Sequence, residues 1–221
     1  MGLRDSGEDP ETVADPALAV PQTAPRAPAV YLQGIGAIVK LAARFTPRNW
    51  NAVTPCPEWR AADLAGHLRC IADNYHEYLD EAPESRLTHL MATNADADSI
   101  ARKLARQNAA ELAVLPDVAP RDHILAFAES ATRYTARLGP LLPLPHHSYR
   151  GRLITVAGMG GMACVEWHVH AWDLASVLGE SYRPEDPEAV LAGWMVGIPH
   201  IPVVPDDDPW RSVLRSAGRL Q

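Results

Sequence analysis

Three side chains in the 221-residue sequence have types and spacings that suit a metal site. Glu166 and His170 are four residues apart in a predicted helix, which places a carboxylate and an imidazole on one face, one turn apart. His67 lies in the apolar stripe of another predicted helix, so its ring should point inward. If these helices are neighbours, the three side chains converge. Two imidazoles and one carboxylate are a ligand set of catalytic zinc, and they leave one coordination position open.

The spacing also has a purely structural interpretation. A single inward-facing histidine is often a hydrogen-bonded core residue, and a Glu–His pair one turn apart is often a contact on a helix surface. Asp63 and Asp173 lie one turn from His67 and His170, so either carboxylate could orient an imidazole as a hydrogen-bond acceptor. Helix capping or solvation explains these two aspartates equally well.

Other side chains carry weaker signals. Cys70 follows His67 by three residues and offers a soft fourth ligand, although an unpaired cysteine is commonly buried core. His168 lies between the two ligand candidates of its helix, which turns it about 200° away from both, so it should face another element. His146 and His147 follow two closely spaced prolines, and we interpret them as a solvated pair in a loop.

The elements that must position these residues are predicted to be helices. Apolar residues recur at three- and four-residue intervals, and prolines or glycines separate the periodic segments. Alternation of period two never extends beyond four residues, and no repeat or nucleotide-binding glycine pattern is present. The predicted fold class is all-α, an up-down four-helix bundle with extra short helices. The predicted helices cover residues 30–46, 59–82, 96–115, 120–139, 153–178, 187–196 and 209–219.

Two local patterns qualify this assignment. Gly158, Gly160 and Gly161 each cost roughly 1 kcal/mol in a helix relative to alanine, so they indicate either a close approach of backbone or ligand, or a break in the helix. Asp208 and Pro209 have the types expected at the N-cap and first position of a terminal helix.

Composition limits the classes of function. The net charge of −7, from 27 acidic and 20 basic residues, argues against nucleic acid as a partner. Three widely spaced cysteines make no disulfide framework, and no apolar run is long enough to span a membrane, so we expect a cytoplasmic protein. Residues 1–29 are proline-rich and predicted to be a disordered tail, followed by a single domain over residues 30–221.

Three segments, in order along the chain, resemble the signatures of the mycothiol-dependent maleylpyruvate isomerase family, which belongs to the DinB-like superfamily. The first contains the sequence Thr-Pro-Cys-Pro-Glu-Trp followed by Asp-Leu and His-Leu pairs, the second is Glu-Trp-His-Val-His-Ala-Trp-Asp-Leu-Ala, and the third combines Pro-Trp with Gly-Arg. These segments are residues 54–59 with 63–64 and 67–68, residues 166–175, and residues 209–210 with 218–219.

The resemblance implies a helical bundle in which His67, Glu166 and His170 hold a divalent metal, typically zinc. It also implies mycothiol, a low-molecular-weight thiol, as cosubstrate for isomerisation or for S-transfer to a small electrophile. In isomerisation the thiolate adds to a cis double bond, the bond rotates, and elimination leaves the trans isomer. Maleylpyruvate isomerases of this family carry a further C-terminal domain similar to sterol-carrier proteins, and we expect the sequence to Gln221 to be the short form without it.

Two other functions remain open at this point. The metal could instead serve a thiol-independent hydrolase or cyclase of a biosynthetic pathway, in which water or substrate takes the open position. Alternatively, the bundle could bind a small hydrophobic molecule without turnover. Each function predicts a small molecule as the partner, and the sequence is compatible with either a monomer or a homodimer.

Overall fold

The computed structural model describes residues 27–56, 59–81, 84–93 and 96–221, so the expectation of a disordered tail falls largely outside it. The described part is mainly helical and contains only a small two-stranded hairpin besides, which confirms the all-α class. The elements are α1 (Ala27–Ala42), α2 (Pro47–Trp50), α3 (Ala61–Asp80), α4 (Arg86–Thr93), α5 (Ala97–Ala113), α6 (Pro120–Leu138), the 3₁₀ helix η2 (Gly139–Leu141), β1 (Pro145–Tyr149), β2 (Arg152–Thr155), α7 (Val156–Val177), α8 (Pro187–Gly197) and α9 (Pro209–Ser216).

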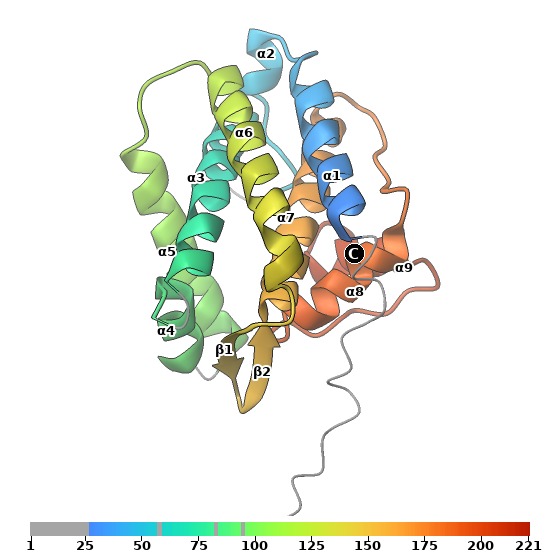
Figure 1. The fold of residues 1–221 in the computed structure, drawn as a ribbon. Coiled ribbons are helices and arrows are strands. Elements are labelled where there is room, and N and C mark those ends of the chain that lie inside the picture. Colours follow the sequence, from blue (N-terminus) through green and yellow to red (C-terminus); the bar gives the residue numbers. More distant parts are fainter. Residues whose placement is uncertain (1–26, 57–58, 82–83, 94–95) are drawn as a thin grey trace, which may run out of the picture.

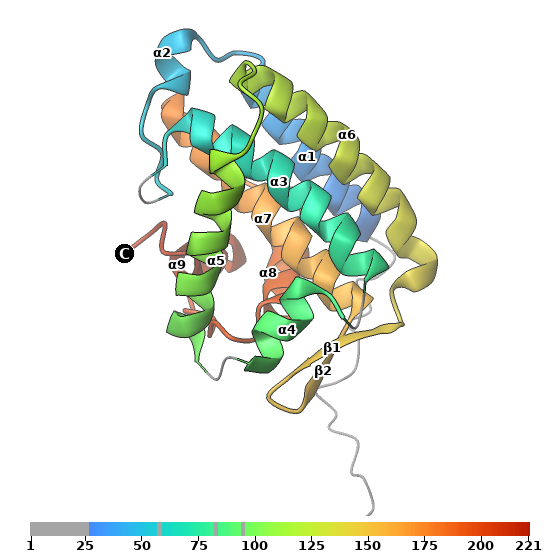
Figure 2. The ribbon, with the colours of Figure 1, turned by 90° about the vertical axis from the view of Figure 1, so that its left-hand side faces the viewer.

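Helices α1, α3, α6 and α7 form a four-helix bundle (Figure 1). Neighbours run in opposite directions at the α1–α6 and α3–α7 contacts, whereas α3 and α6 run the same way. Hydrogen bonds between α3 and α6 follow this parallel order: Ser130 Oγ donates to Asp73 at 2.7 Å, and further along both helices Arg137 Nη1 donates to Asp80 at 3.3 Å. Helices α4 and α5 make the parallel arrangement possible, because α5 carries the chain back to the start of α6 (Figure 2).

The bundle is centred on α7, whose 22 residues are apolar nearly all round. Trp167 of α7 is completely buried. Its ring lies 5.9 Å from Tyr31 of α1, 6.3 Å from Tyr75 of α3, and 6.1 and 6.2 Å from Phe127 and Tyr134 of α6, mostly edge to face. Such contacts join all four helices through one aromatic cluster. Within the described part of the chain, no helix combines the length and apolar character needed to cross a membrane.

Helix ends follow the local sequence. Asp208 caps α9 by accepting the Trp210 backbone N–H at 2.8 Å, with Pro209 in the first turn, as the sequence predicted. After α7, Gly179 adopts a φ of +72°, a left-handed conformation that glycine tolerates at no steric cost. Helix α1 begins at Ala27, three residues earlier than predicted, because Pro28 fits the first helical turn.

The prediction for residues 145–155 was wrong. Instead of a loop and the start of a helix, these residues form an antiparallel hairpin in which Tyr149 pairs with Arg152. The two residues between them both have positive φ, which is the conformation of a tight type I′ turn. His146 and His147 are not solvated but buried, with exposed fractions of 2% and 6%. His146 Nε2 donates to the carbonyl oxygen of Tyr78 at 2.8 Å, which ties the hairpin to the end of α3.

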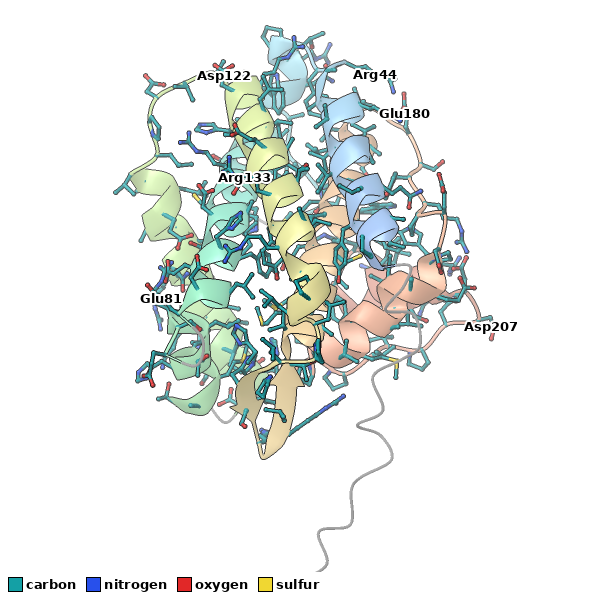
Figure 3. The ribbon with its side chains drawn as sticks, in the orientation of Figure 1. Arg44, Glu81, Asp122, Arg133, Glu180 and Asp207 are labelled. Atoms are coloured by element: carbon teal, nitrogen blue, oxygen red, sulfur yellow. The ribbon has the colours of Figure 1, made fainter. Side chains whose placement is uncertain are left out.

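Many charged side chains lie on the outer surface, among them Arg44, Asp122 and Glu180 (Figure 3). Arg44, which follows α1, forms a two-pronged ion pair with Glu180, which follows α7, and the two labels lie side by side in Figure 3. Both side chains are exposed, at 55% and 40%. Solvent-exposed pairs of this kind contribute little to stability, so packing around α7 carries most of the fold.

Glycines allow α7 and α8 to approach each other closely. A Cβ atom built on Gly161 would lie 2.8 Å from the carbonyl oxygen of Gly193, and one built on Gly197 would lie 2.4 Å from that of Gly158. These contacts are with backbone, which cannot move aside as a flexible side chain would. Of the two interpretations offered for the glycines of α7, close backbone approach is therefore confirmed for Gly158 and Gly161, and the helix is unbroken.

We expect Gly161→Ala to destabilise the protein and Gly36→Ala to stabilise it. At Gly161 the new methyl group forces α7 and α8 apart, at a cost of about 1–3 kcal/mol. At Gly36, in α1, the methyl group meets nothing within 4 Å, so only the helix propensity of alanine acts, with a gain of about 0.5–1 kcal/mol. Urea unfolding of both variants measures the difference. If the two substitutions stabilised the protein equally, the close approach of α7 and α8 at Gly161 would be contradicted.

Candidate metal centre

His67, Glu166 and His170 converge on one point between α3 and α7. The ligand-type atoms of the three side chains all lie within 4.8 Å of one another. Glu166 Oε2 is 3.1 Å from His170 Nε2 and 3.8 Å from His67 Nε2. Among the described residues this is the one group of three such side chains that could hold a metal ion.

The antiparallel helices α3 and α7 determine where the three side chains lie. Glu166 and His170 share a face of α7 because they are one turn apart, and His67 meets them from the first half of α3. The indole of Trp59, just before α3, lies against the His67 imidazole with ring centroids 4.5 Å apart. The two imidazoles meet edge to face at 5.2 Å. Packing therefore fixes both rings before any ligand binds.

Asp173 and Arg219 orient His170. The His170 Nδ1 donates to Asp173 Oδ2 at 2.9 Å, so Nε2 is the nitrogen that faces Glu166. Asp173 is fully buried and also accepts two hydrogen bonds, each 2.9 Å long, from Nε and Nη2 of Arg219. Burial alone would raise the pKa of Asp173, but the hydrogen bonds from His170 and Arg219 outweigh it and lower this pKa overall. The carboxylate therefore stays ionised.

The electrostatics of the three groups favour a positive charge between them. Burial would raise the pKa of Glu166, yet hydrogen bonds from His170 and His67 lower it well below its usual range. Burial lowers the pKa of His67, an effect that its contact with Glu166 only partly offsets. Burial also lowers the pKa of His170, but hydrogen bonds to Asp173 and Glu166 outweigh this effect and raise its pKa overall. At neutral pH the group thus combines an ionised carboxylate with a neutral imidazole from His67.

This donor set fits a divalent cation. Ligand atoms around a tetrahedral zinc ion lie about 3.3 Å apart, close to the 3.1 and 3.8 Å found here between Glu166 and the two imidazoles. The Glu166 side chain keeps 32% of its surface exposed, whereas His67 and His170 keep only 6% and 5%. One side of the group is therefore open, as a catalytic rather than a structural site requires.

The other residues that the sequence analysis considered for the site are not among the three converging side chains. Asp63 accepts the backbone N–H of Arg60 at 2.9 Å and so caps α3, whereas Asp173 has the orienting position. The potential metal group does not include Cys70. His168 faces away, as predicted, since its Nε2 donates to the Val30 carbonyl at 2.9 Å and its Nδ1 accepts from the Tyr182 hydroxyl at 2.6 Å.

A pocket of about 280 Å³ opens from the metal group, and several of its polar residues were not identified from the sequence. Cys56 and Arg219 line the pocket beside His67 and His170. Burial raises the pKa of the Cys56 thiol to about 11, against a smaller opposing effect of the Arg219 guanidinium. The Gly-Arg ending, which resembles the family signature, indicated that Arg219 is a residue of interest. Its partner Asp173 is 46 residues away, so spacing along the sequence could not identify the pair. Trp59 also lines the pocket, whereas Trp167 belongs to the core.

Comparisons with known proteins give one family and one structure. Residues 31–175 match the family model described as mycothiol maleylpyruvate isomerase N-terminal domain. The chain is also similar to a crystal structure of the mycothiol-dependent maleylpyruvate isomerase, with 15% sequence identity and a TM-score of 0.44, over 77% of this chain and 67% of that chain. No curated protein matches the chain.

Proposed function

Because the chain belongs to the mycothiol maleylpyruvate isomerase N-terminal domain family, we propose that it is a metal-dependent enzyme that uses a low-molecular-weight thiol, mycothiol, on a small electrophile. The observation that carries this proposal is the convergence of His67, Glu166 and His170 at the end of a pocket. The proposal takes residues 30–221 as the functional domain.

His67 Nε2, His170 Nε2 and the Glu166 carboxylate would hold the cation, and zinc suits these nitrogen and oxygen donors. A divalent cation held there lowers the pKa of a thiol or water beside it and so supplies a nucleophile at neutral pH. Glu166 contributes the single negative charge of the group. His67 contributes an uncharged nitrogen, because burial disfavours its protonated form.

The surrounding residues prepare the site rather than react. Asp173 and Arg219 hold the His170 ring so that Nε2 faces the centre. Trp59 packs against the His67 ring. Apolar side chains on α4, α5 and α8 continue the pocket away from the metal group and exclude water from it. Polar interactions with a bound electrophile are therefore stronger in this pocket than in water.

Two outcomes of thiol chemistry fit such a site. In isomerisation the thiol sulfur bonds to one carbon of a double bond, the remaining single bond rotates, and elimination restores both the double bond and the thiol. In S-transfer the carbon–sulfur bond persists and the neighbouring carbon takes up the proton of the thiol, so that one adduct consumes both the thiol and the electrophile. The three cysteines of the chain are all unpaired, which supports a reducing compartment such as the cytoplasm as the place of action.

The test is an assay of the zinc-loaded full-length chain with maleylpyruvate and, separately, with the enone 4-phenylbut-3-en-2-one, each with and without mycothiol. A change in the ultraviolet absorbance of the alkene reports reaction. Titration of free thiol then separates isomerisation, which returns the thiol, from S-transfer, which consumes it. We expect turnover only when mycothiol is present. Turnover at the same rate without any thiol would contradict the proposal and favour a hydrolase or cyclase, and binding without turnover would favour a non-catalytic protein.

A further inference from the structure

The pocket extends well beyond the metal group. Met162, Glu166 and His170 lie on successive turns of one face of α7 and all line it. At 1.5 Å per residue, the distance along the helix from His170 to Met162 is about 12 Å. A molecule that reacts at the metal group and fills the pocket must therefore be elongated.

The walls between the two ends are mostly apolar, and Asn108 of α5 adds one neutral amide. They come from α3, α4, α5, α7, α8 and the segment after α8, which surround the pocket from several directions. None of these wall side chains offers a charge to a ligand. The apolar wall residues are Ile71, Leu87, Met91, Leu104, Met162, Val165, Val169, Trp194, Ile198 and Ile201.

His200 lines the pocket from the segment that follows α8. That segment begins where Gly197 packs against Gly158 and Met162, in the first turns of α7. His200 also contacts Tyr149 of the hairpin, with ring centroids 6.0 Å apart. The hairpin lies at the end of the bundle where α7 starts (Figure 1). His200 thus lies towards the end of the pocket opposite His170.

The His200 imidazole is buried but not satisfied. Its side chain is 8% exposed, and its Nδ1 is buried without a hydrogen-bond partner. Burial lowers the pKa of His200 to about 4, so the ring is neutral at pH 7 and carries one proton. A buried N–H without an acceptor is rarer in proteins than a buried acceptor without a donor, so the proton belongs on Nε2. This leaves an N–H donor on a ring that lines the pocket.

A second donor lines the same pocket. The Tyr78 hydroxyl accepts a hydrogen bond from Gln107 Nε2 at 3.4 Å. Its own hydrogen has no acceptor among the described residues. Together with His200, Tyr78 gives the pocket hydrogen-bond donors suited to an oxygen acceptor.

The pocket offers no unpaired cation for a carboxylate. Among the described residues that line it, Arg219 carries the one guanidinium, and Asp173 already binds this group through two hydrogen bonds. His200 and Tyr78 are neutral donors. A carboxylate placed between the apolar walls would lose its hydration without gaining an opposite charge, which is a large cost.

We propose that the electrophile is an elongated, uncharged and largely apolar molecule whose reacting end lies at His67, Glu166 and His170 and whose other end carries a hydroxyl or carbonyl oxygen that His200 binds. This inference rests on the function proposed above and specifies its substrate class. It distinguishes the expected substrate from a small dicarboxylic acid, which would place a second charge on the apolar walls.

The experiment compares three unreactive probes in calorimetric titrations of the zinc-loaded full-length chain. The probes are 4-phenylbutan-2-one, 4-(4-hydroxyphenyl)butan-2-one and 4-(3-oxobutyl)benzoate, which differ only in a hydrogen, a hydroxyl or a carboxylate at the far end. They contain no double bond conjugated with the ketone and need no thiol. Their binding therefore tests the substrate class whether or not the thiol-dependent turnover exists.

We expect the hydroxyl probe to bind about 3- to 10-fold more tightly than the unsubstituted ketone, the gain of one neutral hydrogen bond. The carboxylate probe should bind at least about 10-fold more weakly than the ketone. In His200→Phe, the hydroxyl gain should disappear while the affinity for the unsubstituted ketone changes by less than about threefold. A carboxylate probe that binds as well as the ketone, or a hydroxyl gain that is absent in the wild type or persists in His200→Phe, would overturn the proposal.

Discussion

Zinc binding should fall more than about 100-fold when His67 is replaced by alanine or Glu166 by glutamine, because each change removes one of the three proposed protein ligands. Thiol-dependent turnover should fall in parallel, since the proposed function assigns activation of the thiol to the bound cation. Equilibrium dialysis against zinc, followed by elemental mass spectrometry, measures the affinity of protein prepared without a polyhistidine tag.

Two matched variants control for the loss of a side chain as such. His89→Ala removes an exposed histidine of α4, and Glu129→Gln neutralises a carboxylate on α6 whose side chain is 73% exposed. Neither residue lines the pocket, so both variants should keep the zinc affinity of the wild type. If His67→Ala and Glu166→Gln bind zinc as well as these controls, the ligands lie elsewhere.

The second large effect concerns Asp173. In Asp173→Ala the Arg219 guanidinium, whose side chain is only 10% exposed, loses its carboxylate partner. Removal of one member of a buried ion pair costs about 3–5 kcal/mol of unfolding free energy. The His170 ring also loses the acceptor that orients it, so zinc affinity should fall about 10- to 100-fold. Urea unfolding and zinc dialysis measure the two effects on the same protein.

A double variant separates stability from orientation. In Asp173→Asn with Arg219→Gln both charges are gone, so most of the lost stability should return, because a buried pair of charges can be replaced by neutral groups at little cost. Zinc affinity should stay low, since an amide is a weaker acceptor for His170 than a carboxylate. Asp63→Ala removes only the cap of α3, at about 1 kcal/mol or less, and should leave zinc affinity unchanged. A zinc affinity that recovers together with stability would contradict the orienting role of Asp173.

The main helices and the one-turn pairing of Glu166 with His170 could be predicted because their signals are local. Helical periodicity and flanking prolines defined α3 and α6, and one-turn spacing placed Glu166 and His170 on one face of α7. The meeting of α7 with His67 of α3 could not be deduced from periodicity, because spacing along one helix contains no information about its neighbours. The resemblance to a family supplied that step.

Other features depended on contacts between distant segments. The hairpin was missed because its strands have only five and four residues and its turn is Arg150–Gly151, which is a weaker signal than Asn–Gly. Burial of His146 follows from its hydrogen bond to Tyr78, 68 residues away in the sequence. Arg219 and Asp173 are likewise far apart in the sequence. The effect of this pair on His170 is therefore visible only in the folded chain.

The most direct test of the metal centre is anomalous diffraction at the zinc absorption edge from crystals of the zinc-loaded protein. We predict one strong peak about 2.0–2.2 Å from His67 Nε2, His170 Nε2 and a carboxylate oxygen of Glu166. A peak elsewhere, or none at this position in protein shown by elemental analysis to contain zinc, would contradict the assignment of these three residues as the ligands.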